Sequence, residues 1–155
     1  MNREDETGAG APPTPGTANA ILSDLLWEVS AYVELRGEAA LADLPISTAS
    51  SGMLMTVYAE PGVTVAEMAR RKPKSPQSIS QIVARLEKLG LIERRLKKGR
   101  GVGLHLTDEG RHTAEMASER ERATDDQLVG LLGKRRHETL RQLLVESRAL
   151  LRSAE

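Results

Sequence analysis

A polar helix face near the middle of the chain carries the side chains whose chemistry is most telling. From Ser75 to Leu89, apolar residues recur at the spacing of one helix face. The opposite face offers Gln, Ser and Arg side chains, with no acidic residue before Glu87. Gln can pair with adenine in the major groove, and Ser can reach phosphates or base edges. Surface helices usually carry mixed charges, so this pattern favours contact with DNA over a merely solvated face.

Basic residues flank this helix on both sides. Arg70, Arg71, Lys72 and Lys74 precede it, and we expect them to contact phosphates. A second basic stretch, residues 97–101, is rich in glycine and lies between two short strand candidates. The full set of expected DNA-contacting residues is Lys72, Lys74, Ser75, Pro76, Gln77, Ser78, Ser80, Gln81, Arg85, Lys97, Lys98 and Arg100.

The distribution of charge supports this interpretation, although the net charge of the chain is zero. Residues 1–60 carry 2 basic and 9 acidic groups, and residues 61–111 carry 12 basic and 5 acidic groups. The remaining residues carry 8 of each. Concentrating positive charge in one central block is typical of a lobe that binds a polyanion.

Capping signals predict the elements that position this helix. Residues 1–17 have the composition of a disordered tail, and a helix then runs to about residue 42. A second helix ends at residues 60–62, a short third helix stops at Pro73, and Pro76 opens the polar helix, which Gly90 closes. The expected N-caps are Thr17 or Asn19, Ser47 or Thr48, Thr64 with Glu67 in a capping box, and Ser75.

The second half of the chain is expected to form a hairpin and two helices. Strands at 91–96 and 102–106 are joined by the basic turn, Thr107 caps a helix reaching about residue 132, and a last helix covers 134–152. Residues 111–127 have few large apolar side chains, so we expect them to bury little within their own chain. The terminal helices exceed the needs of a small core. We therefore expect a homodimer, with residues of about 20–35 and 110–152 at its interface; a monomeric bundle is the alternative.

Residues 64–107 resemble the MarR (multiple antibiotic resistance regulator) family. The resemblance rests on Ser75-Pro76, on the run LEKLGLIER at 86–94 and on LTDEG at 106–110. It implies an α+β, mostly α fold: a winged helix-turn-helix DNA-binding lobe at 47–107 and a helical dimerisation region at 18–46 and 108–155. Members of that family are homodimeric repressors or activators that bind palindromic operators in double-stranded DNA. Many release DNA when a small anionic or phenolic effector binds.

Three positions depart from the family pattern. The wing often carries an Asp-x-Arg triplet, but here Lys98 stands in place of the Asp, whereas Arg100 keeps the Arg. Gln81 stands where Arg is frequent, which changes the expected base preference. Lys72 and Lys74 replace residues that are usually apolar, and this makes the turn before the polar helix strongly basic.

The resemblance also implies an effector cleft between the dimer helices and the DNA-binding lobe. Few aromatic side chains are available to line it, since the chain has one Trp, two Tyr and no Phe. An alternative of about equal weight is that the candidates belong to the core. The candidate lining residues are Trp27, Tyr32, Met53, Met55 and Tyr58.

Other classes of function have less support. No nucleophile and base share a recognisable context, so we expect no enzyme activity, no catalytic residues and no cofactor. The chain has no Cys, and its three His residues are scattered, so no metal site is expected. The acidic N-terminus lacks the apolar stretch of a signal peptide, and a cytoplasmic location is expected. A winged-helix module that binds protein rather than DNA is the remaining alternative.

Overall fold

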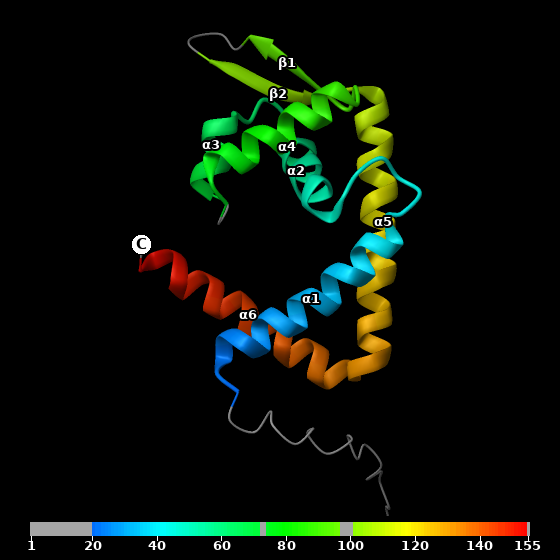
Figure 1. Ribbon diagram of the computed structural model, residues 1–155, viewed down its shortest axis with the longest axis vertical. Helices are drawn as coiled ribbons and strands as arrows, with labels where there is room; N and C mark the ends of the chain where they lie inside the picture. The colour runs from blue at the N-terminus through cyan, green and yellow to red at the C-terminus, as the bar shows by residue number, and fades with distance from the viewer. Residues whose placement is uncertain (1–19, 72–73, 97–100, 155) are drawn as a thin grey trace, which may run out of the picture. The chain divides into compact units, whose positions relative to one another are not determined.

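The chain forms helices and one hairpin in the order expected from its sequence (Figure 1). The computed structural model describes residues 20–71, 74–96 and 101–154. The chain divides into two units, Met1–Val33 and Glu34–Glu155, and the boundary falls within the first helix. The elements are α1 (Leu22–Ala40), α2 (Thr48–Ala59), α3 (Val65–Arg71), α4 (Pro76–Lys88), β1 (Ile92–Leu96), β2 (Val102–Leu106), α5 (Asp108–Leu132) and α6 (Lys134–Ser153).

Local hydrogen bonds explain where the helices begin. Ser47 caps α2 by accepting from the backbone N–H of Ser50, and Thr64 and Glu67 form the reciprocal capping box before α3. Two boundaries differ from expectation. The first helix starts at Leu22, later than a cap at Thr17 or Asn19 implies, and the cap of α4 is Leu89 rather than Gly90. Gly90 follows it with φ 70°, as in helices that end on a left-handed residue.

The hydrophobic core is built from α2, α3, α4, the hairpin and the first half of α5. Its side chains are aliphatic, as the scarcity of aromatic residues requires. The hairpin pairs Ile92 with Leu106 and Leu96 with Val102 in antiparallel register. The core residues are Leu41, Ile46, Met53, Leu54, Val57, Val63, Met68, Ile79, Val83, Leu86, Leu91, Ile92, Leu104, Ala114 and Ala117.

Helix α5 buries more than its composition suggested. The expectation that residues 111–127 bury little holds for large apolar side chains, but small residues of this segment are buried because they let the helix approach its neighbours closely. The closest approach is at Gly110, where an added Cβ would lie 1.8 Å from the carbonyl oxygen of Leu91. Small residues therefore supply tight packing where large apolar residues are missing. The buried residues of α5 are Gly110, Thr113, Ala114, Ala117 and Thr124.

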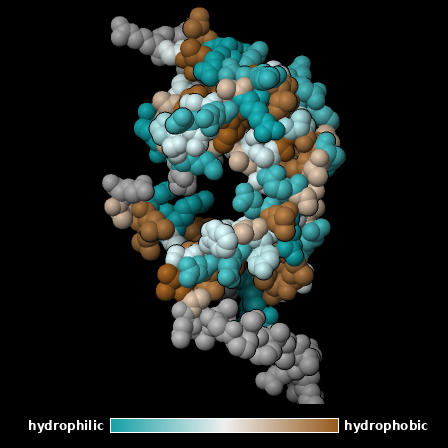
Figure 2. All heavy atoms as spheres, viewed as in Figure 1, coloured by the Kyte–Doolittle hydropathy of each residue, from teal (hydrophilic) through white to brown (hydrophobic). Residues whose placement is uncertain are grey.

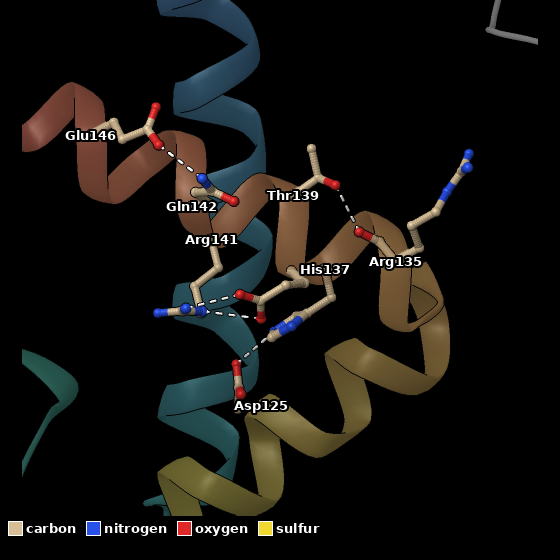
Figure 3. A network of polar contacts seen from close by, with 8 residues as sticks. Asp125, Arg135, His137, Thr139, Arg141, Gln142 and Glu146 are labelled. Atoms are coloured by element: carbon tan, nitrogen blue, oxygen red, sulfur yellow. Dashed lines mark hydrogen bonds and ion pairs between the residues drawn. The ribbon is translucent and has the colours of Figure 1, made fainter.

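Polar contacts link α5 to the helix that follows it. Gly133 ends α5 with φ 78°, and α6 begins at the next residue. Figure 3 shows His137 of α6 facing Asp125 of α5, with 2.9 Å between Nε2 and Oδ1. Arg141 donates to the carboxylate of Glu138, one turn earlier in α6. None of the helices formed by residues 20–71, 74–96 and 101–154 has the length and hydropathy that a membrane span requires.

Candidate nucleic-acid interface

Helix α4 is held in place by its apolar face. Ile79, Val83 and Leu86 are fully buried, and Ser75 caps the helix by accepting from the backbone N–H of Ser78 at 3.1 Å. Pro76 occupies the first helical position, where no backbone N–H is needed. The polar face is consequently fixed toward solvent.

The expected contact residues in and just before α4 differ in whether their polar groups already have a partner. Lys74, Ser75, Pro76, Gln77, Ser78, Ser80, Gln81 and Arg85 are all exposed. The hydroxyl groups of the three serines are occupied: Ser75 and Ser78 lie 2.9 Å apart, and Ser80 donates to the carbonyl of Pro76 at 2.9 Å. Among the described residues, Gln77, Gln81 and Arg85 have no intramolecular hydrogen-bond or ion-pair partner. Together with Lys74, which likewise has no partner among the described residues, these three side chains are available to an external ligand.

The one acidic residue of α4 is neutralised by the hairpin. Arg94 of β1 binds both carboxylate oxygens of Glu87, at 2.7 and 3.0 Å. This hydrogen bond raises the pKa of Arg94 above its ordinary range, so the guanidinium stays charged. The pair removes a negative charge from the exposed face and ties the hairpin to α4. Sequence reasoning missed this pair, because seven residues and a turn separate its members.

Four basic candidates belong to segments that the structure does not describe. Lys72, Lys97, Lys98 and Arg100 lie outside the described residues. The strands on either side of 97–101 end at Leu96 and resume at Val102, as expected. On β1, Glu93 accepts from Nε of Arg95 at 2.6 Å.

Arg71, one of the residues expected to contact phosphates, has partners within the protein. Its guanidinium pairs with Glu60, and its backbone carbonyl accepts from Nη2 of Arg152 at 3.1 Å. The hydrogen bond to Glu60 raises the pKa of Arg71. Arg70 is exposed and, within the described part of the chain, unpaired. The phosphate-contact expectation therefore stays with Arg70, Lys72 and Lys74, whereas Arg71 holds the end of α3.

Two of the candidate effector residues line a cavity within the second unit. A cavity of about 300 Å³ lies between α2 and α5 and includes Met55 and Tyr58. Met53 is 2% exposed and belongs to the core, so the core alternative applies to it. Trp27 and Tyr32 lie on α1 within the first unit and are 71% and 65% exposed. The full lining is Met55, Tyr58, Ala114, Glu115, Ser118, Glu119 and Arg122.

Sequence reasoning missed the α5 side of this cavity. Glu115, Ser118, Glu119 and Arg122 are spaced three and four residues apart, so they share one face of the helix. That spacing was visible in the sequence, but polar residues on a long helix are usually solvated and give no sign of a cavity by themselves.

Comparisons with known proteins agree with this arrangement. A MarR family profile matches residues 44–100. The HTH-type transcriptional repressor Rv2887 of Mycobacterium tuberculosis is 30% identical over 116 residues, covering 74% of this chain and 84% of that protein. The chain belongs to the MarR family.

Solved structures of MarR proteins share the fold. Rv2887 in complex with DNA superimposes with a TM-score of 0.69 at 27% identity, over 83% of this chain and 98% of that one. Its complex with salicylic acid gives 0.68, also at 27% identity, over 84% and 98%. The repressor CouR bound to a 23-mer DNA duplex gives 0.80 at 23% identity, over 89% and 99%. The MarR fold, a winged helix with additional terminal helices, therefore extends over most of this chain.

Proposed function

We propose that this MarR protein is a sequence-specific, double-stranded DNA-binding transcriptional regulator that represses its targets as a homodimer. The observation that carries the proposal is the exposed face of α4. It presents Gln77, Gln81 and Arg85, which have no partner among the described residues, while Arg94 neutralises the only acid of the helix. Relatives named as repressors, and the DNA complex of Rv2887, support the same function. Because Rv2887 is named as a transcriptional repressor, the role proposed for this chain is regulatory rather than enzymatic.

The experiment is a gel shift on the DNA upstream of the protein's own gene. Gln81→Ala should cost about 1–3 kcal/mol on the operator and change the preference inside the half-site, because a bidentate base contact is lost. Lys74→Ala should weaken binding to all sequences alike and reduce the salt slope by about one. Ser80→Ala should cost less than Gln81→Ala, since its hydroxyl already donates to the carbonyl of Pro76. Equal, salt-independent retention by all variants would instead favour a protein-binding winged helix.

The apolar side chains that α1 and α6 leave exposed support the proposed homodimer. We expect residues of about 20–35 and 110–152 to form the interface. The two copies of α4 would then lie about 34–36 Å apart, in successive major grooves of a palindromic operator. The domain division proposed is a tail at 1–17, a dimerisation region at 18–46 and 108–155, and a DNA-binding lobe at 47–107. Sedimentation showing a stable monomer at micromolar concentration would contradict this.

The wing is proposed to contribute a minor-groove contact. Arg100 lies between two glycines in the turn, and a lone Arg is attracted to the negative potential of a narrow minor groove. Lys97 and Lys98 are better suited to phosphates. Arg100→Ala should weaken binding and relax the preference for A·T pairs at the operator flanks. Unchanged affinity at physiological salt would exclude this role.

A small-molecule effector is proposed to regulate DNA binding. The cavity lined by Met55 and Tyr58 supports this, as does the salicylic acid complex of Rv2887. Trp27 and Tyr32 stay candidate effector-lining residues. A gel shift with and without added ligand tests the proposal, and a flat response across a broad panel would contradict it.

A further inference from the structure

The cavity between α2 and α5 has one apolar wall and one charged wall. Met55, Ala114 and the ring of Tyr58 form the apolar wall. The charged wall comes from α5, whose first half lies beside α2 (Figure 1). A space of about 300 Å³ is enough for a small single-ring molecule.

The carboxylates of the charged wall have unused capacity. Glu115 accepts one bond, from the Tyr58 hydroxyl at 3.3 Å, and Glu119 has no partner within the described part of the chain. Arg122 is likewise unpaired among these residues, and it is the only basic residue of the lining. Ionised carboxylates only accept hydrogen bonds, so Glu115 retains acceptor capacity beyond its one bond, and Glu119 accepts from no described residue.

The aromatic ring of this cavity is already oriented. Arg111 lies with its guanidinium carbon 5.6 Å from the centre of the Tyr58 ring, and the Tyr58 hydroxyl is bonded to Glu115. One ring face and the hydroxyl are therefore taken by α5. Arg111 does not line the cavity, so it does not supply the missing donors there.

We propose that this cavity selects a ligand carrying a cationic amine beside an apolar or aromatic body. The ammonium group would bind Glu119 and Glu115, while the body lies against Met55 and Ala114. An anionic ligand would meet two like charges and one guanidinium, so this chain should favour the opposite charge to the salicylic acid bound by Rv2887. The inference rests on the proposed function in treating the ligand as an effector, and the α5 wall of the cavity falls within residues 110–152, the range proposed for the dimer interface.

Matched probes isolate the effect of ligand charge. Tyramine and 3-(4-hydroxyphenyl)propionate share a phenol ring and a two-carbon tether, and they differ in carrying an ammonium or a carboxylate. Calorimetric titration of the full-length protein, without DNA, should show tyramine binding about fivefold tighter or more, the size expected of an exposed ion pair. Equal affinities, a preference for the carboxylate, or no binding of either probe at millimolar concentration would overturn the proposal.

Variants then assign the preference to the cavity. Glu119→Gln should abolish most of the preference for tyramine, because it removes an unpaired carboxylate without breaking an intramolecular bond. Asp126→Asn is the matched control: it removes the same charge from an exposed position of α5 outside the cavity. Circular dichroism verifies that both variants fold. If both variants reduced the preference equally, the net charge of the helix rather than the cavity would be responsible, and the proposal would fail.

The two proposals fail separately. Ligand affinity is measured without DNA, and operator binding is measured without ligand. A protein that binds its operator but does not distinguish the two probes retains the proposed function and loses the ligand inference. A protein that prefers tyramine but shows no operator binding gives the reverse result.

Discussion

The DNA-binding lobe and the terminal helices differ in what they bury. Every residue of the hydrophobic core lies between Leu41 and Ala117. Helices α1 and α6, of 19 and 20 residues, contain no buried residue in the described structure. Large hydrophobic side chains stay exposed on both, and hydrophobic residues are visible at the surface in Figure 2. The most exposed of these are Leu22, Trp27, Leu150 and Leu151, each at 71%.

This difference shows that the two regions are stabilised by different means. Most helical stability in proteins comes from packing an apolar face, and isolated helices of this length are marginal. The lobe satisfies that requirement within its own chain. Helices α1 and α6 retain unburied apolar side chains, which supports their burial against a second copy.

The largest effect expected from this comparison comes from truncating the core. Leu54→Ala should lower the free energy of unfolding by about 3–4 kcal/mol, because Leu54 is fully buried and the lost methylenes leave a cavity. Leu144→Ala removes the same atoms from α6, where the residue is 46% exposed. Urea denaturation measures both changes.

Protein concentration separates the two variants. Dimerisation stabilises the fold by mass action, so Leu144→Ala should lower the denaturation midpoint most at high protein concentration and have little effect where both proteins are monomeric. Leu54→Ala should lower it at every concentration. If Leu144→Ala were neutral throughout, α6 would have no partner surface at this position, and the comparison would no longer support dimerisation.

The lobe was more predictable from sequence than the cavity. The helix caps of the lobe, such as Ser75 before Pro76, depend on neighbouring residues, and the apolar face of α4 follows the helical period. Both features can therefore be predicted from local sequence. The α5 packing and the Glu87–Arg94 pair depend on tertiary approach between distant segments, which no local signal encodes. Met53 and Met55 illustrate the limit: two residues apart on one helix, one enters the core and the other lines the cavity.

A smaller effect is expected from close packing of α5. Gly110→Ala should destabilise the lobe by about 2–3 kcal/mol, because its Cβ would overlap the carbonyl of Leu91 and force the backbone to move. Gly130→Ala is the matched control on the same helix, since an added Cβ there meets nothing within 4 Å. The control should stabilise by up to about 1 kcal/mol through helix propensity. Urea midpoints that changed alike in both variants would show that α5 does not pack as described.

The smallest effect concerns the polar contacts that join the end of α1 to the lobe. Glu38 accepts from the backbone N–H of Thr48 at 2.7 Å and from its hydroxyl, and Asp43 pairs with Arg120, with 2.6 Å between Nη2 and Oδ2. The Thr48 hydroxyl and then its N–H lower the pKa of Glu38. The hydrogen bond from Arg120 lowers the pKa of Asp43.

The sign of the pH dependence follows from these directions. A carboxyl with a lowered native pKa binds a proton more readily when unfolded, so it stabilises the fold above its unfolded value and loses that contribution as the pH falls through the native value. Asp43→Asn and Glu38→Gln should each reduce the loss of stability between pH 6 and the acid range below the ordinary Asp and Glu pKa values, about 3.8 and 4.5.

Salt distinguishes the two variants, because it screens the exposed ion pair of Asp43 but not the bonds that Glu38 accepts from uncharged donors. Raising the ionic strength should therefore shrink the difference between wild type and Asp43→Asn while leaving that of Glu38→Gln in place. Acid-unfolding curves at low and high salt measure this, and identical salt dependence of the two variants would show that Arg120 contributes no ionic interaction to the junction.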